Sequence, residues 1–120
     1  MMLQFRPAQR LRRQTDIRAV RESGTRTDCG AFTLWVRRRP EGTPPVHARA
    51  GVVASIAAVG DAVARNRAKR RLREVFRRHQ AIVPAGWDLL LVARSSVNRW
   101  PFDRLEQTFV AACTRLCAHA

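Results

Sequence analysis

Residues 65–78 constrain this chain more than any other segment, because they combine a high positive charge with a helical repeat. They contain seven arginines, one lysine and one glutamate, a net charge of +7, which is half of the +14 carried by all 120 residues. The apolar residues recur at helical spacing, which predicts a helix with one face toward a core and one toward solvent. A surface this cationic repels itself unless a polyanion binds it. Nucleic acid is therefore the first partner to test.

The two faces of this helix follow from a turn of 100° per residue. The apolar stripe consists of Ala68, Leu72, Val75 and Phe76. On the opposite side, positions i, i+4, i+7 and i+11 form a straight row about 16 Å long. We call this row the basic ladder; it consists of Asn66, Arg70, Arg73 and Arg77. One alternative is a basic face that is merely solvated. Another is a helix that lies on a membrane, but this would need the short apolar stripe that the core of the fold requires.

Length and composition indicate one domain with a core of its own. The chain has 120 residues, 46% of them hydrophobic, and a pI of about 11.8. Residues 1–14 carry no acid and are expected to form a basic N-terminal arm, followed by a single domain over residues 15–120, which the family resemblance given below makes an RNA-binding domain. Three cysteines without a signal-type segment favour the reducing cytoplasm, and the lack of an 18-residue apolar run argues against a membrane partner.

The rest of the chain alternates between helical and strand patterns. We expect helices over residues 15–23, 61–80 and from Pro101 onward, and strands over residues 31–36, 46–56 and 87–93. Thr15 is a candidate cap for the first helix. The strand at 46–56 is apolar on both faces, which predicts a central position in the sheet. The strand–helix–strand order around residues 61–80 allows a parallel crossover.

The side chains do not suggest that the protein catalyses a reaction by itself. The nine acidic residues contain no paired motif for two-metal hydrolysis, and the three histidines are isolated from one another. Cys113, Cys117 and His119 are too sparse for a metal site, and Cys113 is expected to pack in the last helix. We therefore predict no catalytic residue and no protein metal site. Arg37–Arg39 fit a second RNA contact and a solvated loop equally well.

The order of residues within the basic helix is more specific than its charge. From Gly60 to Arg77 the chain reads Ala-Val, then Arg-Asn-Arg, Lys-Arg, Arg-Glu and Phe-Arg. This order closely resembles the signature of the bacterial ribonuclease P protein subunit, and the resemblance extends over about residues 9–94. It implies an α+β fold, a single-domain two-layer α/β sandwich with the order α-β-β-β-α-β-α and a left-handed βαβ crossover (ribosomal protein S5 domain 2-like). One of the three strands before the basic helix is implied only by this resemblance.

The resemblance also implies a function. In that family a large RNA is the catalyst and uses Mg²⁺ to remove the 5′ leader from precursor tRNA, and the protein binds both RNAs without a small-molecule cofactor. By position in the family motif, the residues expected to contact the catalytic RNA are Arg65, Asn66, Arg67, Lys69, Arg70 and Arg73. Arg77, the last residue of the basic ladder, is expected to contact it as well. The residues expected in a leader cleft between the first helix and the sheet are Ile17, Arg21, Phe32 and Trp35.

Two departures from the family pattern predict weaker leader binding. The family usually has aromatic residues at the positions of Ile17 and Arg21, and lysines where this chain has the uncharged segment 55–60. The main alternative is a structural RNA-binding protein of ribosomal type with no role in an enzyme. Composition fits both functions, and only the Arg-Asn-Arg block favours ribonuclease P.

Overall fold

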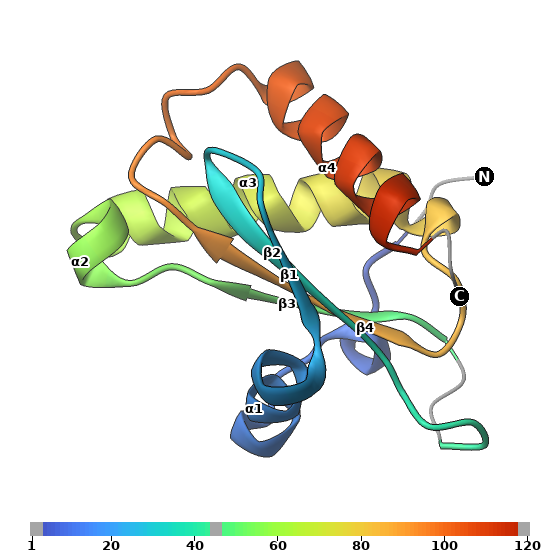
Figure 1. Cartoon of the computed structure of the whole chain (residues 1–120). Helices are drawn as coiled ribbons and strands as arrows, with labels where there is room; N and C mark the ends of the chain where they lie inside the picture. Colours follow the sequence, from blue (N-terminus) through green and yellow to red (C-terminus); the bar gives the residue numbers. More distant parts are fainter. Residues whose placement is uncertain (1–3, 44–46, 118–120) are drawn as a thin grey trace.

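Four strands form one sheet in the computed structural model, which describes residues 4–43 and 47–117 (Figure 1). The strands are β1 (Thr25–Asp28), β2 (Phe32–Arg38), β3 (Arg49–Val53) and β4 (Trp87–Ala93). Their order across the sheet is β1-β2-β4-β3, and β4 runs parallel to β3 but antiparallel to β2. The helices are α1 (Gln14–Ser23), α2 (Ile56–Val59), α3 (Ala62–His79) and α4 (Phe102–Leu116), with 3₁₀ turns at Pro7–Gln9 and Gln80–Ile82.

The order of these elements confirms the predicted α+β fold class. Three strands precede α3 and one follows it, and β3, α3 and β4 form the parallel crossover that the sequence pattern allowed. The strand that the residues alone did not predict is β1. It reads Thr-Arg-Thr-Asp and lacks the apolar alternation by which a strand is usually recognised. In the described part of the chain, no helix is both long enough and apolar enough to cross a membrane.

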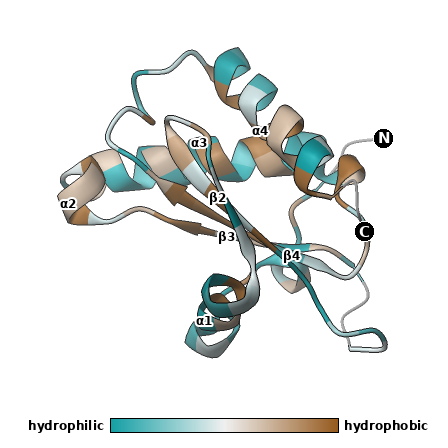
Figure 2. Cartoon of the chain, in the orientation of Figure 1, coloured by the Kyte–Doolittle hydropathy of each residue, from teal (hydrophilic) through white to brown (hydrophobic). Residues whose placement is uncertain are grey.

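Helices cover both faces of the sheet (Figure 1). Helices α3 and α4 lie on one face, where most of the apolar residues gather (Figure 2), and α1 lies on the other. The predicted stripe of α3 is fully buried against the sheet. From α4 the core receives Leu105, Phe109, Ala112 and Cys113. The smaller α1 face is centred on Leu11, Val20 and Leu90.

Strand β3 lies at an edge of the sheet, so the prediction of a central position is wrong. Ala50 and Gly51 are buried, and Val52 and Val53 are partly buried, because other segments cover the strand and not because it has a strand on each side. The backbone of residues 10–11 runs along its outer edge, where the Leu11 N–H donates to the Ala50 carbonyl at 2.9 Å. Leu11 is 4% exposed, so the described part of the predicted N-terminal arm lies against the domain. The strand also ends at Val53, before the predicted boundary.

Capping residues set the ends of the helices. The Asp61 carboxylate accepts a hydrogen bond from the Ala64 N–H at 2.9 Å, and this N-cap begins α3 where the sequence predicts. Just before it, Ser55 caps the single turn of α2 in the same way, which explains why the strand pattern predicted through residue 56 is interrupted. The predicted cap of α1 is wrong, because the helix begins at Gln14 and Thr15 lies inside its first turn.

A buried charge cluster fixes the start of α1 to the sheet. Asp88 of β4 is fully buried and receives two hydrogen bonds from Arg49 of β3, at 2.9 Å and 2.8 Å. Arg49 also reaches Asp16 of α1 at 3.4 Å. The Asp88 hydrogen bonds raise the pKa of Arg49 above its ordinary value. Arg39, which is 5% exposed, pairs with Asp88 as well, so it is neither the RNA contact nor the solvated loop residue that the sequence suggested.

Candidate nucleic-acid interface

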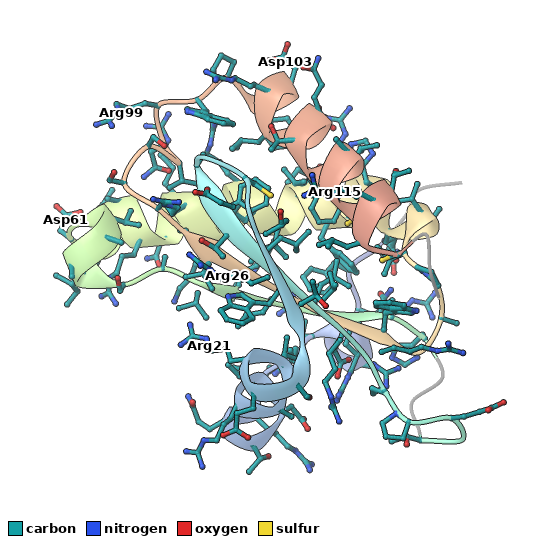
Figure 3. All side chains as sticks on the ribbon, in the orientation of Figure 1. Arg21, Arg26, Asp61, Arg99, Asp103 and Arg115 are labelled. Atoms are coloured by element: carbon teal, nitrogen blue, oxygen red, sulfur yellow. The ribbon has the colours of Figure 1, made fainter. Side chains whose placement is uncertain are left out.

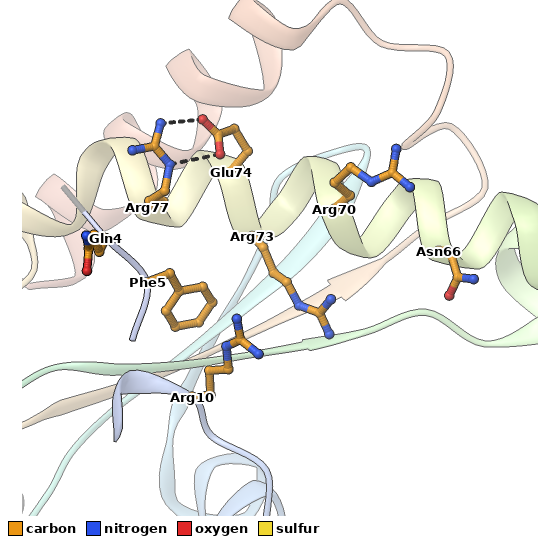
Figure 4. A pocket seen from close by; sticks show the side chains of 8 residues that line it. All are labelled: Gln4, Phe5, Arg10, Asn66, Arg70, Arg73, Glu74 and Arg77. Atoms are coloured by element: carbon orange, nitrogen blue, oxygen red, sulfur yellow. Dashed lines mark hydrogen bonds and ion pairs between the residues drawn. The ribbon is translucent and has the colours of Figure 1, made fainter. Parts of the chain in front are cut away.

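The basic ladder of α3 lines one groove (Figure 4). This groove has a volume of about 650 Å³, and the N-terminal segment forms its opposite wall. The lining residues are Gln4, Phe5, Arg10, Asn66, Arg70, Arg73, Glu74 and Arg77. All four ladder residues are among them, so the predicted spacing identified a real face of the helix. That this face binds RNA stays a prediction.

The charge of the ladder is mostly uncompensated. Of the lining residues that the structure describes, Glu74 alone is acidic, and it accepts a hydrogen bond from Arg77 Nε at 2.9 Å (Figure 4). This interaction lowers the pKa of Glu74, which therefore stays ionised near neutral pH. Among the described residues, neither Arg70 nor Arg73 pairs with a carboxylate. The middle of the ladder therefore presents two guanidinium groups to the groove, in the planar form that suits phosphate.

The other cations predicted to contact RNA lie outside this groove. Arg67 is exposed, and Arg65 and Lys69 are partly buried along the flanks of α3. The neighbouring Arg71 has a structural role, because it donates to the Trp100 carbonyl. Burial is the main reason why the pKa of Arg71 is lowered, and repulsion by Arg67 adds to it. The residues predicted to contact the catalytic RNA are thus divided between the face of α3 that lines the groove and the two flanks of that helix.

Two of the predicted cleft residues lie together on the α1 side of the sheet. Ile17 of α1 and Trp35 of β2 are partly exposed and pack against the same apolar cluster. Val53 and Val92 pack there as well, so apolar surface continues along the sheet beside the indole. Arg21 is exposed on α1. This combination of a half-exposed aromatic ring, apolar neighbours and a cation is typical of surfaces that bind single-stranded nucleic acid.

Phe32 is not part of this surface, and the expectation that it lines a cleft with Trp35 is not met. Its side chain is fully buried in the larger core, on the α3 and α4 face. The reason is strand geometry: residues 32 and 35 are three apart, and an odd spacing places side chains on opposite faces. The position of Phe32 in the family motif therefore assigned its side chain to the wrong face of the sheet.

Arg26 is a further residue of this surface that the sequence did not reveal. It lies on β1, directly across from Trp35 in the antiparallel pair, and its guanidinium lies 6.0 Å from the centroid of the indole. Figure 3 shows Arg21 extending from α1 toward the side of the sheet where Arg26 lies. Strand β1 has no recognisable pattern, so no sequence signal could have paired Arg26 with Trp35. We call Ile17, Arg21, Arg26, Trp35, Val53 and Val92 the α1-side surface.

A second hollow, of about 360 Å³, lies between the N-terminal segment, α1, β3 and α3. It shares Phe5, Arg10 and Arg73 with the ladder groove, and Ile17 of the α1-side surface also lines it. Arg12 joins it from the N-terminal segment. Arg10 and Arg12 were expected only as charges of a separate arm.

The cysteines lie within the fold. Cys113 is buried in the core, as predicted, and Cys29 and Cys117 are also free thiols. Burial raises the pKa of Cys29 to about 11, and it raises the pKa of Cys113 further. Within residues 4–43 and 47–117, no group of three potential ligands is arranged to hold a metal ion. His119 lies outside the described residues.

The chain is similar to characterised proteins over most of its length. The family model described as "Ribonuclease P" matches residues 5–117. The ribonuclease P protein component of Chloroflexus aggregans is 35% identical over 115 residues, which cover 94% of this chain and 81% of that protein. That of Desulfovibrio desulfuricans is 33% identical over 112 residues, covering 92% and 84%. The structure of the RNase P protein from Thermotoga maritima superposes with a TM-score of 0.74 at 26% identity, covering 88% of this chain and 96% of that chain.

Proposed function

This chain belongs to the ribonuclease P protein family, and we propose that it is the protein subunit that supports removal of the 5′ leader from precursor tRNA in the bacterial cytoplasm. In this proposal the catalytic RNA binds the basic ladder of α3, and the single-stranded leader binds the α1-side surface. The RNA subunit holds the Mg²⁺ ions and performs the hydrolysis. The protein contributes binding and charge neutralisation.

The groove beside α3 carries the proposal. It places Asn66, Arg70 and Arg73 on one wall within a single depression, and Glu74 beside them is already engaged by Arg77. A groove with a large excess of positive charge concentrates a polyanion near the protein. Each arginine guanidinium group can donate hydrogen bonds to two oxygens of one phosphate group. Binding would also release counterions from the RNA, so the affinity should fall steeply with salt.

The α1-side surface suits a different part of the RNA. A folded RNA helix keeps its bases stacked inside, whereas a single strand exposes base faces that can stack on an indole. Trp35 offers such a face, Arg26 lies over the indole and helps to orient it, and Arg21 offers a charge for an adjacent phosphate. The 5′ leader is a single-stranded part of a precursor tRNA. With Ile17 in place of an aromatic residue, the surface has less stacking area than the family pattern provides.

Reconstitution tests this function. The full chain is combined with a bacterial ribonuclease P RNA, and cleavage of precursor tRNA is followed as Mg²⁺ is lowered. We expect cleavage at Mg²⁺ concentrations at which the RNA alone is inactive, because bound arginines replace part of the counterion requirement. If the rate and the cleavage site equal those of the RNA alone, the proposal is wrong.

Two controls separate the roles of protein and RNA. The protein without the RNA should leave precursor tRNA intact, and robust cleavage would show that the protein is itself a nuclease. A structural RNA-binding protein of ribosomal type would bind the RNA without changing its Mg²⁺ requirement. That outcome would support the alternative function.

A further inference from the structure

Arginines from two different segments face each other where the ladder groove meets the second hollow. Figure 4 shows the Arg10 guanidinium pointing from the N-terminal segment toward the Arg73 guanidinium, which points from α3. Both residues line both depressions. Arg12 lines the second hollow beside them, and none of the described residues that line this hollow is acidic. Three like charges therefore converge on one place, and in the described part of the chain the groove carboxylate, Glu74, is paired with Arg77.

The fold holds these charges together with several contacts. The Leu11 N–H donates to Ala50, which ties the segment to β3. Gly51 permits this approach, since a Cβ atom there would lie 2.8 Å from the Leu11 carbonyl oxygen. On the α3 side, the Phe5 ring packs against the Phe76 ring, with 5.1 Å between the two ring centroids. The positions of Arg10 and Arg12 are thus set by packing on both sides and not by chance in a loose tail.

The electrostatic cost of this arrangement is visible at Arg73. Its pKa lies below the ordinary value, first because burial disfavours the charge and then because Arg10 and Arg12 repel it. A structure that maintains such repulsion in the free protein is typical of a binding site for the opposite charge. The chemistry of the ligand follows from the donors, since convergent guanidinium groups match the oxygens of a phosphate.

The surroundings favour a phosphate over a base at this point. The Phe5 ring contacts Phe76, and it also has the Arg10 guanidinium over it at 5.4 Å from its centroid. The Phe5 ring is thus engaged by Phe76 and by Arg10, and it helps to orient the Arg10 guanidinium. The hollow also reaches Ile17 at one end and the ladder at the other. A strand that passed from the α1-side surface to α3 would cross it.

We propose that Arg10, Arg12 and Arg73 bind one phosphodiester group of single-stranded RNA at the junction between the α1-side surface and the basic ladder. The inference rests on the proposed function in one respect, because it takes single-stranded RNA as the ligand that meets this surface. It adds the N-terminal segment to the binding surface and joins the two RNA-binding regions into one track.

A double-mutant cycle on the full chain tests the shared phosphate. The probe is a single-stranded oligouridylate of about ten nucleotides, within the range of single-strand site sizes. Arg10→Ala and Arg73→Ala should each weaken binding by about tenfold, as expected for loss of one charged hydrogen-bond donor. The double variant should lose clearly less than the product of the two effects, because both side chains act on the same group.

Arg6→Ala is the matched control, because it removes an exposed arginine of the same segment that lines neither depression. Its affinity should stay within about twofold of the unmodified chain, since only distant charge is lost. If Arg10→Ala binds like Arg6→Ala, or if the Arg10 and Arg73 effects multiply, the proposal is wrong.

Thermal unfolding with inorganic pyrophosphate gives a second measurement that does not depend on RNA. Pyrophosphate should raise the Tm of the unmodified chain and of Arg6→Ala more than that of Arg10→Ala, because a ligand stabilises the state that binds it. Equal shifts in all three would overturn the site, even if Arg10→Ala lowers the starting Tm.

The failure of this site can be told apart from the failure of the proposed function. If the full chain supports cleavage at low Mg²⁺ but Arg10→Ala matches Arg6→Ala in the binding assay, the function stands and the site is wrong. If the oligouridylate cycle behaves as expected but the reconstituted particle gains nothing from the protein, the site stands and the function is wrong.

Discussion

The basic ladder and the α1-side surface differ in how the chain builds them. The ladder comes from one helix, and its members lie within twelve consecutive residues, 66–77. The α1-side surface takes residues from α1, β1, β2, β3 and β4, and only the sheet pairing brings Arg26 opposite Trp35. A surface on one helix depends on local periodicity, whereas a surface on several strands depends on the whole fold.

The two regions also differ in where their ion pairs lie. At the ladder, Glu74 and Arg77 pair at the protein surface. Beneath the start of α1, Asp88 is completely buried between two arginines. Screening by water weakens the first kind of pair, and desolvation makes the second kind costly to break. Substitutions in the two regions should therefore differ most in their effect on the stability of the fold and less in their effect on RNA binding.

The largest expected effect is on folding. Asp88→Ala leaves the buried Arg39 and the partly buried Arg49 without their shared carboxylate, and should lower the free energy of unfolding by about 3–5 kcal/mol. Glu74→Ala is the matched change at the ladder and should have a much smaller effect, because its pair is solvated. Urea unfolding measures both. Similar losses for the two variants would contradict the contrast between the regions.

The next effect is on salt dependence. Replacing Arg70 and Arg73 by alanine should flatten the slope of log affinity for the catalytic RNA against log salt by roughly 1–2 units, since fewer counterions are released. Replacing Arg21 and Arg26 removes the same charge from the α1-side surface and should leave that slope nearly unchanged. A filter-binding series over several salt concentrations would show whether the catalytic RNA distinguishes the two surfaces.

Stacking should give a smaller and more selective effect. Trp35→Ala should weaken binding of leader-bearing tRNA to the reconstituted particle by about 1–3 kcal/mol, the range of one base–aromatic contact. Mature tRNA provides the control, because it lacks the leader and should bind as before. Trp35→Phe should recover most of the loss. Equal weakening for both tRNAs would indicate that the indole serves packing and not leader binding.

The smallest expected effect concerns Arg26. Arg26→Ala should cost about 0.5–1 kcal/mol of leader affinity, the size of an exposed cation–π contact. Combined with Trp35→Ala, its effect should largely disappear, because the guanidinium lies over that ring. Additive losses would mean that Arg26 contacts the leader on its own.

The contrast also explains how much the sequence could predict. The faces of α3, its Asp61 cap and the bounds of β4 follow from local patterns and are confirmed. The apolar residues of β3 indicated burial but could not show what covers the strand, so β3 was expected at the centre of the sheet although it lies at an edge. Phe32 was placed by position in a family motif, although strand alternation sets it opposite Trp35. Arg10, Arg26 and the Asp88 cluster depend on contacts between distant segments, which no local pattern records.

The cover over β3 has a consequence for how the protein can be truncated or fused. An open strand edge pairs readily with another chain, and this one is closed by the backbone of residues 10–11. The opposite edge, β1, is only four residues long and mostly polar, which makes it a poor template for such pairing. A shortened chain that began after Leu11 would expose an edge beside the apolar pair Val52 and Val53. Self-association of that chain would then be mistaken for a loss of RNA affinity.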